Sequence, residues 1–202
     1  MKLYFAPSAC SLASHIALRE ADLPFELIKV NNATKETAEG GDFRKVNPKG
    51  YVAALVLDNG QVLTEAPALL QYLADLKPET GLAPANGSWE RVRLQEMLAF
   101  ISSEIHTGGC SPLFNKSIPE EVKTFFRDKL NARLELIAAT LGERDYLLGE
   151  RFSVADALLF TILRWMGPLK VDLGRWPAFA GYLQRIEARP SVKAALEAEA
   201  AA

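Results

Sequence analysis

The sequence has few of the features that mark secreted, membrane-spanning or disulfide-stabilised proteins. Its 202 residues include only two cysteines, Cys10 and Cys110. The chain does not begin with a charged segment followed by an apolar stretch, and it has no uninterrupted run of about 18 apolar residues. We therefore predict neither a signal peptide nor a membrane helix, and we expect a cytoplasmic chain with two free thiols.

An excess of one charge is also lacking. There are 23 Lys and Arg against 25 Asp and Glu, which gives a formal net charge of −2. Nucleic-acid binding requires a basic surface, so we expect no such partner. Zinc-type spacing of Cys, His, Asp or Glu is missing, as are the glycine-rich phosphate-binding motifs, and we expect no metal.

Glycine and proline are sparse, at 13 and 11 residues, but Pro78, Gly81, Pro84 and Gly87 lie close together. Such clusters mark linkers. We therefore predict a first domain over residues 1–80, a linker over 77–87, and a second domain over 88–202.

The first domain alternates between strand-like and helix-like segments. Asp58-Asn59-Gly60 has the composition of a hairpin turn with positive φ at both turn positions. The pattern predicts an α+β domain, a mixed sheet with helices against it. The expected strands are 2–5, 25–30, 53–57 and 61–63, and the expected helices are 11–21 and 65–76, with a loop and a short irregular helix over 31–47.

The second domain has the pattern of an all-α domain. Ser153 and Asp156 form a capping box that starts a buried helix, which is a structural signal rather than a chemical one. The expected helices are 89–106, 119–141, 153–165, 176–188 and 191–200.

Cys10 lies where the first strand passes into the first helix. A helix N-terminus favours the thiolate, so we predict a lowered pKa and a reactive thiol. Ala13 stands three residues later, so there is no Cys-x-x-Cys pair, and Cys10 would need an external thiol to complete a redox cycle. The alternative is a buried cysteine that only packs.

Three other segments are candidates for binding. Residues 47–57 enter a strand through Pro48 and Gly50, and a free strand edge there would pair with an extended peptide. Thr64 is the expected N-cap of the helix that follows, and the N–H of Ala66 would then face a ligand carboxylate. His106 shares a helix face with Ser102 or Ser103. Each candidate also has a purely structural interpretation. Residues 47–57 would be an ordinary loop that enters a strand, Thr64 would cap a helix that binds no ligand, and His106 would be a surface or core histidine.

Taken together, these segments resemble bacterial glutathione transferases, most closely the beta class with its active-site cysteine. The resemblance extends over essentially the whole chain, and the order and spacing of the segments make it specific. The segments are KLYFAPSACSLASHIALRE, VNPKGYVAALVLDNGQVLTE, LLQYLAD, LAP, ISSEIH, SPLFN, LLGERFSVADALLF and IEARPSV.

The resemblance implies a thioredoxin-like N-terminal domain, an all-helical C-terminal domain, a homodimer, and glutathione as cosubstrate. It implies that Cys10 faces the glutathione sulfur with Ser11 beside it. It further implies that Lys35 binds the glycine carboxylate, that the Val52 backbone pairs with the cysteinyl part, and that Glu65 and Ala66 bind the γ-glutamyl end. In the interdomain cluster of the family, it implies that Ser103 takes part, that Glu104 reaches the partner subunit's glutathione, and that His106 lies near the thiol.

Three positions depart from the family pattern. Ala53 replaces a cis-proline, and a cis bond before a non-proline residue costs about 3–4 kcal/mol. The sequence leaves open whether this bond is cis, or trans with a differently shaped loop. Ala66 replaces Ser or Gly and removes a hydroxyl. Thr107 replaces a lysine, and Gly108-Gly109 after it are expected to soften the helix end, with Cys110 in a loop as a second thiol near the site.

Two functions are compatible with these residues. The first is a glutathione-dependent enzyme in which Cys10 favours thiol–disulfide exchange with mixed-disulfide substrates, together with conjugation of small hydrophobic electrophiles. The second is a protein on the same fold that binds hydrophobic ligands with little catalysis, which Ala53 and Ala66 favour. The sequence does not identify the second substrate.

Overall fold

The computed structural model describes residues 1–142 and 144–202. Their contacts divide the chain into two compact units, Met1–Ala83 with Ala188–Ala202, and Pro84–Glu187. The boundary lies within the predicted linker. The last fifteen residues, expected in the second domain, group instead with the first unit. None of the described helices is long and apolar enough to cross a membrane.

The described part of the first unit contains a four-stranded mixed sheet with the order β2-β1-β3-β4. β1 pairs in parallel with β2 and antiparallel with β3, and β3 pairs antiparallel with β4. The strand segments and their order agree with the sequence prediction to within two residues at each end. The strands are β1 (Lys2–Phe5), β2 (Glu26–Lys29), β3 (Ala54–Val56) and β4 (Val62–Thr64).

Alternation along β1 separates two apolar layers, because successive side chains of a strand point to opposite faces. Tyr4 packs with Ile28, Ala54 and Phe43 on one face, where Phe43 belongs to the 3-10 helix η1 (Phe43–Lys45). Phe5 lies on the other face, with its ring 6.4 Å from that of His15. Both layers are buried.

The turn between β3 and β4 differs from its prediction. Gly60 has φ +82°, but Asn59 is not among the residues with positive φ. Leu57 and Gln61 close the turn through a hydrogen bond from the Leu57 N–H to the Gln61 carbonyl (2.8 Å). A three-residue loop therefore replaces the expected two-residue one, and only its glycine needs the left-handed region.

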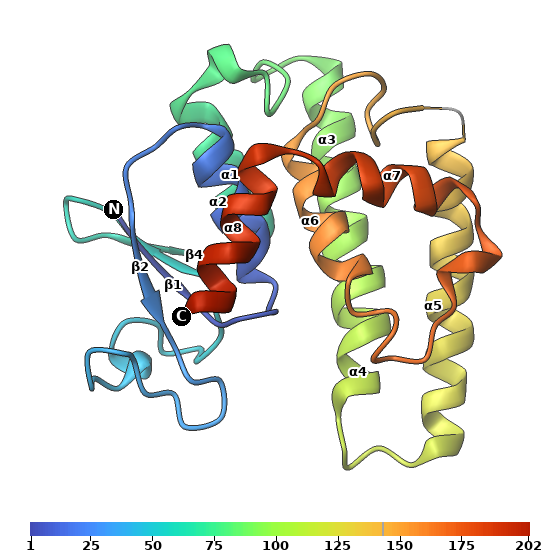
Figure 1. The fold of residues 1–202 in the computed structure, drawn as a ribbon, viewed down its shortest axis with the longest axis horizontal. Coiled ribbons are helices and arrows are strands. Elements are labelled where there is room, and N and C mark those ends of the chain that lie inside the picture. The colour runs from blue at the N-terminus through green and yellow to red at the C-terminus, as the bar shows by residue number, and fades with distance from the viewer. Residues whose placement is uncertain (143) are drawn as a thin grey trace. The chain divides into compact units, whose positions relative to one another are not determined.

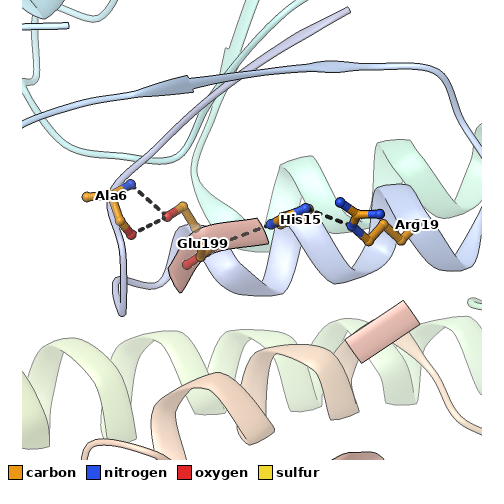
Figure 2. Close-up of polar contacts among 5 residues, drawn as sticks. Ala6, His15, Arg19 and Glu199 are labelled. Carbon is orange, nitrogen blue, oxygen red and sulfur yellow. Dashed lines mark hydrogen bonds and ion pairs between the residues drawn. The ribbon is translucent and has the colours of Figure 1, made fainter. Parts of the chain in front are cut away.

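Three helices of the first unit pack together. α1 (Ser11–Glu20) contacts both α2 (Ala66–Leu76) and α8 (Pro190–Ala201), and Figure 1 shows α8 alongside α1. His15 of α1 is fully buried and lies between Arg19 and Glu199 (Figure 2). Its Nδ1 is 3.2 Å from Glu199 Oε1, and Arg19 Nε donates to its Nε2 at 2.9 Å. This contact attaches the end of the chain to the helix that follows Cys10.

Helices are the regular elements among the described residues of the second unit, as expected. α6 is buried along its whole length, and both reciprocal bonds of the Ser153–Asp156 capping box are present. The helices are α3 (Trp89–Phe100), the π-helix η3 (Ile101–Cys110), α4 (Ser111–Phe114), α5 (Glu120–Leu141), α6 (Val154–Leu163), the 3-10 helix η4 (Leu173–Arg175) and α7 (Ala178–Glu187).

The prediction of a helix that softens after His106 is wrong. η3 continues as a π-helix to Cys110, which is buried in it rather than placed in a loop. A Cβ on Gly108 would lie 2.6 Å from the Ser103 carbonyl oxygen, and one on Gly109 would lie 2.9 Å from Leu130 Cδ1. Gly108 therefore leaves room for the backbone of the π-helix itself, and Gly109 permits the close packing of the π-helix against Leu130 of α5.

Candidate active site

Cys10 is the N-cap residue of α1, as the sequence predicts. The turn before it carries Ser8 at φ +61° and closes with a bond from the Ala9 N–H to the Ala6 carbonyl. Ser11 is buried, and its hydroxyl accepts from the Ala6 N–H and donates to the Ala6 carbonyl, at 3.2 and 3.3 Å. The Ser11 hydroxyl thus shapes the turn that presents Cys10.

The thiol of Cys10 is partly buried and donates to the Val52 carbonyl oxygen at 3.2 Å. Burial raises the pKa of this thiol from 9.0 to about 11, the negative charge of Glu65 adds to the rise, and the N–H groups of Cys10 and Ser11 oppose it. The predicted lowering of the pKa is therefore wrong for this structure. Desolvation outweighs the helix N-terminus, so Cys10 is a neutral S–H donor at pH 7.

The segment before β3 brings Val52 to the thiol. Asn47 is buried, and its side-chain amide donates to the Tyr51 carbonyl at 2.7 Å, while the Gly50 N–H returns to the Asn47 carbonyl. The Val52–Ala53 peptide bond, whose isomer the sequence leaves open, is cis. With this loop fixed by Asn47, the Val52 carbonyl points at Cys10.

Glu65 belongs to the same site. It directly follows β4, the strand next to β3 on the side away from β1. It is the N-cap of α2, whereas Thr64, the predicted N-cap, is the last residue of β4. Glu65 has φ +70°, a backbone conformation that non-glycine residues seldom adopt and that is often found at functional sites. Ala66 begins α2, where the first N–H groups have no partner inside the helix. A carboxylate and helix N–H donors therefore lie side by side.

Two lysines lie near these groups. Lys35 Nζ is 5.6 Å from the centre of the exposed Tyr51 ring, next in the chain to Val52. Lys49 Nζ lies 2.6 Å from Glu65 Oε1 and 2.9 Å from Thr64 Oγ1. Sequence reasoning missed Lys49, because its partner is sixteen residues away and only the folded loop brings the two together.

The other predicted site residues belong to the second unit. Glu104 Oε2 accepts from Arg133 Nε at 2.8 Å and lies 3.5 Å from Lys129 Nζ, so its pKa is lowered, chiefly by the bond from Arg133. The hydroxyl of Ser103 donates to the Ala99 carbonyl at 2.9 Å. Both polar groups are therefore engaged within this unit.

His106 takes part in an aromatic cluster of the second unit. Its ring centre lies 5.2 Å from that of Trp165, and the half-exposed Phe114 meets Trp165 edge-on at 5.7 Å. Burial lowers the pKa of His106, so the ring is neutral at pH 7. The predicted relation of His106, Ser103 and Glu104 to the thiol stays a prediction.

The second cysteine, Cys110, lies in a different environment from Cys10. It is fully buried, and burial raises the pKa of its thiol from 9.0 to about 12. Such a thiol is unreactive at neutral pH. Among the described residues, no group of three or more His, Cys, Asp or Glu is arranged to hold a metal ion.

A mixed sheet of this order with a cysteine at the N-terminus of its first helix, followed by a helical unit, defines a protein with a thioredoxin-like first domain. The glutathione S-transferase N-terminal domain matches residues 7–76, and the corresponding C-terminal domain matches residues 101–190. The chain belongs to the glutathione S-transferase family.

Individual relatives are similar along their whole length. Glutathione S-transferase GstA of Escherichia coli O157:H7 is 43% identical over 199 residues, 98% of each chain. A sphingomonad glutathione S-transferase, solved in complex with glutathione, is 45% identical, with a TM-score of 0.96 over 100% of both chains. The beta-class enzyme of Sphingomonas chungbukensis is 44% identical, with a TM-score of 0.94 over 98% of each. These similarities confirm the predicted family, fold class and glutathione S-transferase function.

Proposed function

We propose that the first unit binds glutathione and activates its thiol for addition to small hydrophobic electrophiles. The sphingomonad relative, solved with glutathione, supports this cosubstrate. Glu65 and the N–H of Ala66 would take the zwitterionic γ-glutamyl end, the Val52 backbone the cysteinyl part, and Lys35 the glycine carboxylate. Val52 accepts from the Cys10 thiol, the charge of Glu65 acts on the same thiol, and Lys35 lies over the ring of Tyr51, the neighbour of Val52.

The observation that carries the proposal is the S–H of Cys10, which donates to the Val52 carbonyl at 3.2 Å and whose pKa is raised by burial to about 11. An ordinary thiol has a pKa of about 8.5, so a glutathione thiol placed beside Cys10 is the stronger acid. In such a pair the proton stays on Cys10, and its S–H would turn from the Val52 carbonyl to the glutathione thiolate. Cys10 would thereby stabilise the nucleophile as a hydroxyl would, which favours conjugation.

Thiol–disulfide exchange is the second candidate, supported by the same partly buried sulfur. A Cys10 thiolate would attack the glutathione sulfur of a mixed disulfide, form a Cys10–glutathione disulfide and release the substrate thiolate. A second glutathione thiolate would attack that disulfide, release oxidised glutathione and restore the Cys10 thiolate. Because the thiol must first lose its proton, this route should accelerate as the pH rises toward 11.

Two variants separate these routes. Cys10→Ser keeps a donor, and we expect it to conjugate glutathione to a chlorodinitrobenzene at a rate within about fivefold of wild type. Cys10→Ala removes the donor, and its conjugation rate should fall tenfold or more, since one donor to a developing anion contributes at least about tenfold to the rate. Exchange should vanish in both variants. If Cys10→Ser loses conjugation as completely as Cys10→Ala, the donor role is excluded.

The aromatic cluster of His106, Trp165 and Phe114 would hold the electrophile, because apolar rings with one neutral polar group suit small hydrophobic substrates. Phe114→Ala is expected to raise KM for the electrophile and leave KM for glutathione unchanged.

The alternative to an enzyme is a non-catalytic binding protein on the same fold. Calorimetry distinguishes the two, because no heat with millimolar glutathione would favour the binding protein.

A homodimer is part of the same proposal. Trp89 and Val92 lie one turn apart on α3, and both are exposed. Exposed apolar side chains on one helix face suit a second copy of the chain. Light scattering should give twice the mass of the chain, and Trp89→Glu should lower that mass; a wild-type monomer would contradict the proposal.

A further inference from the structure

One carboxylate oxygen of Glu65 accepts a hydrogen bond from another side chain, and the other oxygen accepts none from the described residues. Oε1 lies 2.6 Å from Lys49 Nζ, while the described residues provide no hydrogen bond to Oε2. Lys49 is also held by the Thr64 hydroxyl, and Thr64 is fixed in the sheet opposite Ala54. The ammonium of Lys49 is thereby fixed relative to both β4 and the start of α2.

The resulting charge pattern suits an amino-acid head group. A γ-glutamyl end carries an α-ammonium and an α-carboxylate on one carbon, so its receptor must offer an anion and cationic donors close together. Glu65 supplies the anion. Ala66 supplies an N–H but no polar side chain, whereas Lys49 places a cation directly on the Glu65 carboxylate.

We propose that Lys49 is a specificity-determining residue for the γ-glutamyl end of glutathione. It holds Glu65 by Oε1, so that Oε2 accepts from the α-ammonium, and its own charge binds the α-carboxylate of the same head group. This inference rests on the proposed binding of glutathione in the first unit.

A purely structural role for Lys49 gives different expectations. Lys49 and Glu65 are both more than half exposed, and an ion pair of that kind contributes little to stability. If Lys49 only competed with the ligand for Glu65, its removal would tighten glutathione binding. If it binds the α-carboxylate, its removal must weaken binding, and more strongly for ligands that carry that group than for ligands that lack it.

The test compares Lys49→Met with Lys49→Arg and with a matched control, Lys45→Met, which changes an exposed lysine of η1. Each protein is titrated by calorimetry with glutathione and with an analogue that lacks only the α-carboxylate. Lys49→Met should raise the Kd and KM for glutathione about tenfold with kcat within twofold of wild type. Lys49→Arg and Lys45→Met should stay within threefold. With the decarboxylated analogue, which still uses Glu65 for its ammonium, Lys49→Met should lose no more than about threefold relative to wild type.

Three results would overturn the assignment: glutathione affinity unchanged in Lys49→Met, tighter binding in that variant, or an equal loss with both ligands. Thermal unfolding of each variant shows whether the fold is kept, and Lys49→Gln, which also removes the charge, replaces Lys49→Met if that variant is unstable. If wild type itself fails to bind millimolar glutathione, the proposed function falls and this assignment with it. If wild type binds and Lys49→Met is unaffected, only the role of Lys49 falls.

Discussion

The Cys10 thiol and the Val52 carbonyl oxygen, 42 residues apart in sequence, are joined by a 3.2 Å hydrogen bond in which the thiol is the donor. This bond requires the proton on sulfur, so it supports the same protonation state as burial does. The position of Cys10 at a helix N-terminus acts in the opposite direction. Burial is the stronger effect, and the pKa of the thiol rises to about 11.

Cys10 should therefore react slowly with iodoacetamide at pH 7 and faster at higher pH, since the thiolate is the reactive form. An acid with a raised pKa loses its proton only as the pH approaches that pKa, so we expect the modification rate to be half-maximal near pH 11. Peptide mass spectrometry distinguishes Cys10 from Cys110. A midpoint below pH 8 would contradict this account.

Glu65→Gln should move that midpoint to a lower pH. The carboxylate of Glu65 is one of the causes that raise the pKa of Cys10, and a neutral amide would no longer repel the thiolate. The same alkylation profile, recorded with this variant, provides the measurement. Because desolvation is the larger cause, the midpoint should stay above that of a free thiol. An unchanged profile would show that the two groups do not interact.

Most of the fold is predictable because it depends on local patterns. Alternating apolar residues predict the strands, and the cluster of Gly and Pro over 77–87 predicts the unit boundary. The capping box of Ser153 and Asp156 marks the start of the buried helix. Each of these signals lies within a few residues of the structure that it specifies.

The site is less predictable, because its properties depend on contacts between distant segments. Nothing near Lys49 in the sequence indicates that it meets Glu65. The helix dipole predicts the wrong direction for the pKa of Cys10, since burial depends on the whole fold. Gly109 looks flexible in the sequence because its packing partner on α5, Leu130, lies about twenty residues further along the chain. The return of residues 188–202 to the first unit is likewise a long-range effect.

Glu199→Ala should lower the stability of the protein, because it leaves the Nδ1–H of His15 without its acceptor in the core. Since Arg19 Nε donates to His15 Nε2, the ring must carry its proton on Nδ1, which faces Glu199. A buried donor without a partner costs about 1–3 kcal/mol. Denaturant unfolding would measure this loss. Glu197→Ala, an exposed position on the same helix, is the control, with an expected change within about 0.5 kcal/mol.

Asp156→Asn should be more costly. The buried carboxylate accepts from the N–H groups of Leu147 and Ser153, from the Ser153 hydroxyl and from the Tyr182 hydroxyl, at 2.7–3.1 Å. An amide retains only one accepting oxygen, so two donors lose their acceptor. We expect a loss of about 3 kcal/mol in unfolding free energy. Asp128→Asn, at an exposed position of α5, is the control, and equal effects of both changes would contradict the prediction.

Gly108→Ala tests whether the glycines of the π-helix serve packing or flexibility. The new Cβ would lie 2.6 Å from the Ser103 carbonyl oxygen, a backbone atom that cannot move without disturbing η3. Overpacking of this kind costs about 1–3 kcal/mol. Gly181→Ala is the matched control, because Gly181 lies in α7 with open space around its Cβ position. There alanine should stabilise the protein by about 0.5–1 kcal/mol, through helix propensity alone. If Gly108 served only to loosen the helix end, alanine would stabilise both positions alike. Opposite signs in denaturant unfolding would show that close packing is what requires glycine at residue 108.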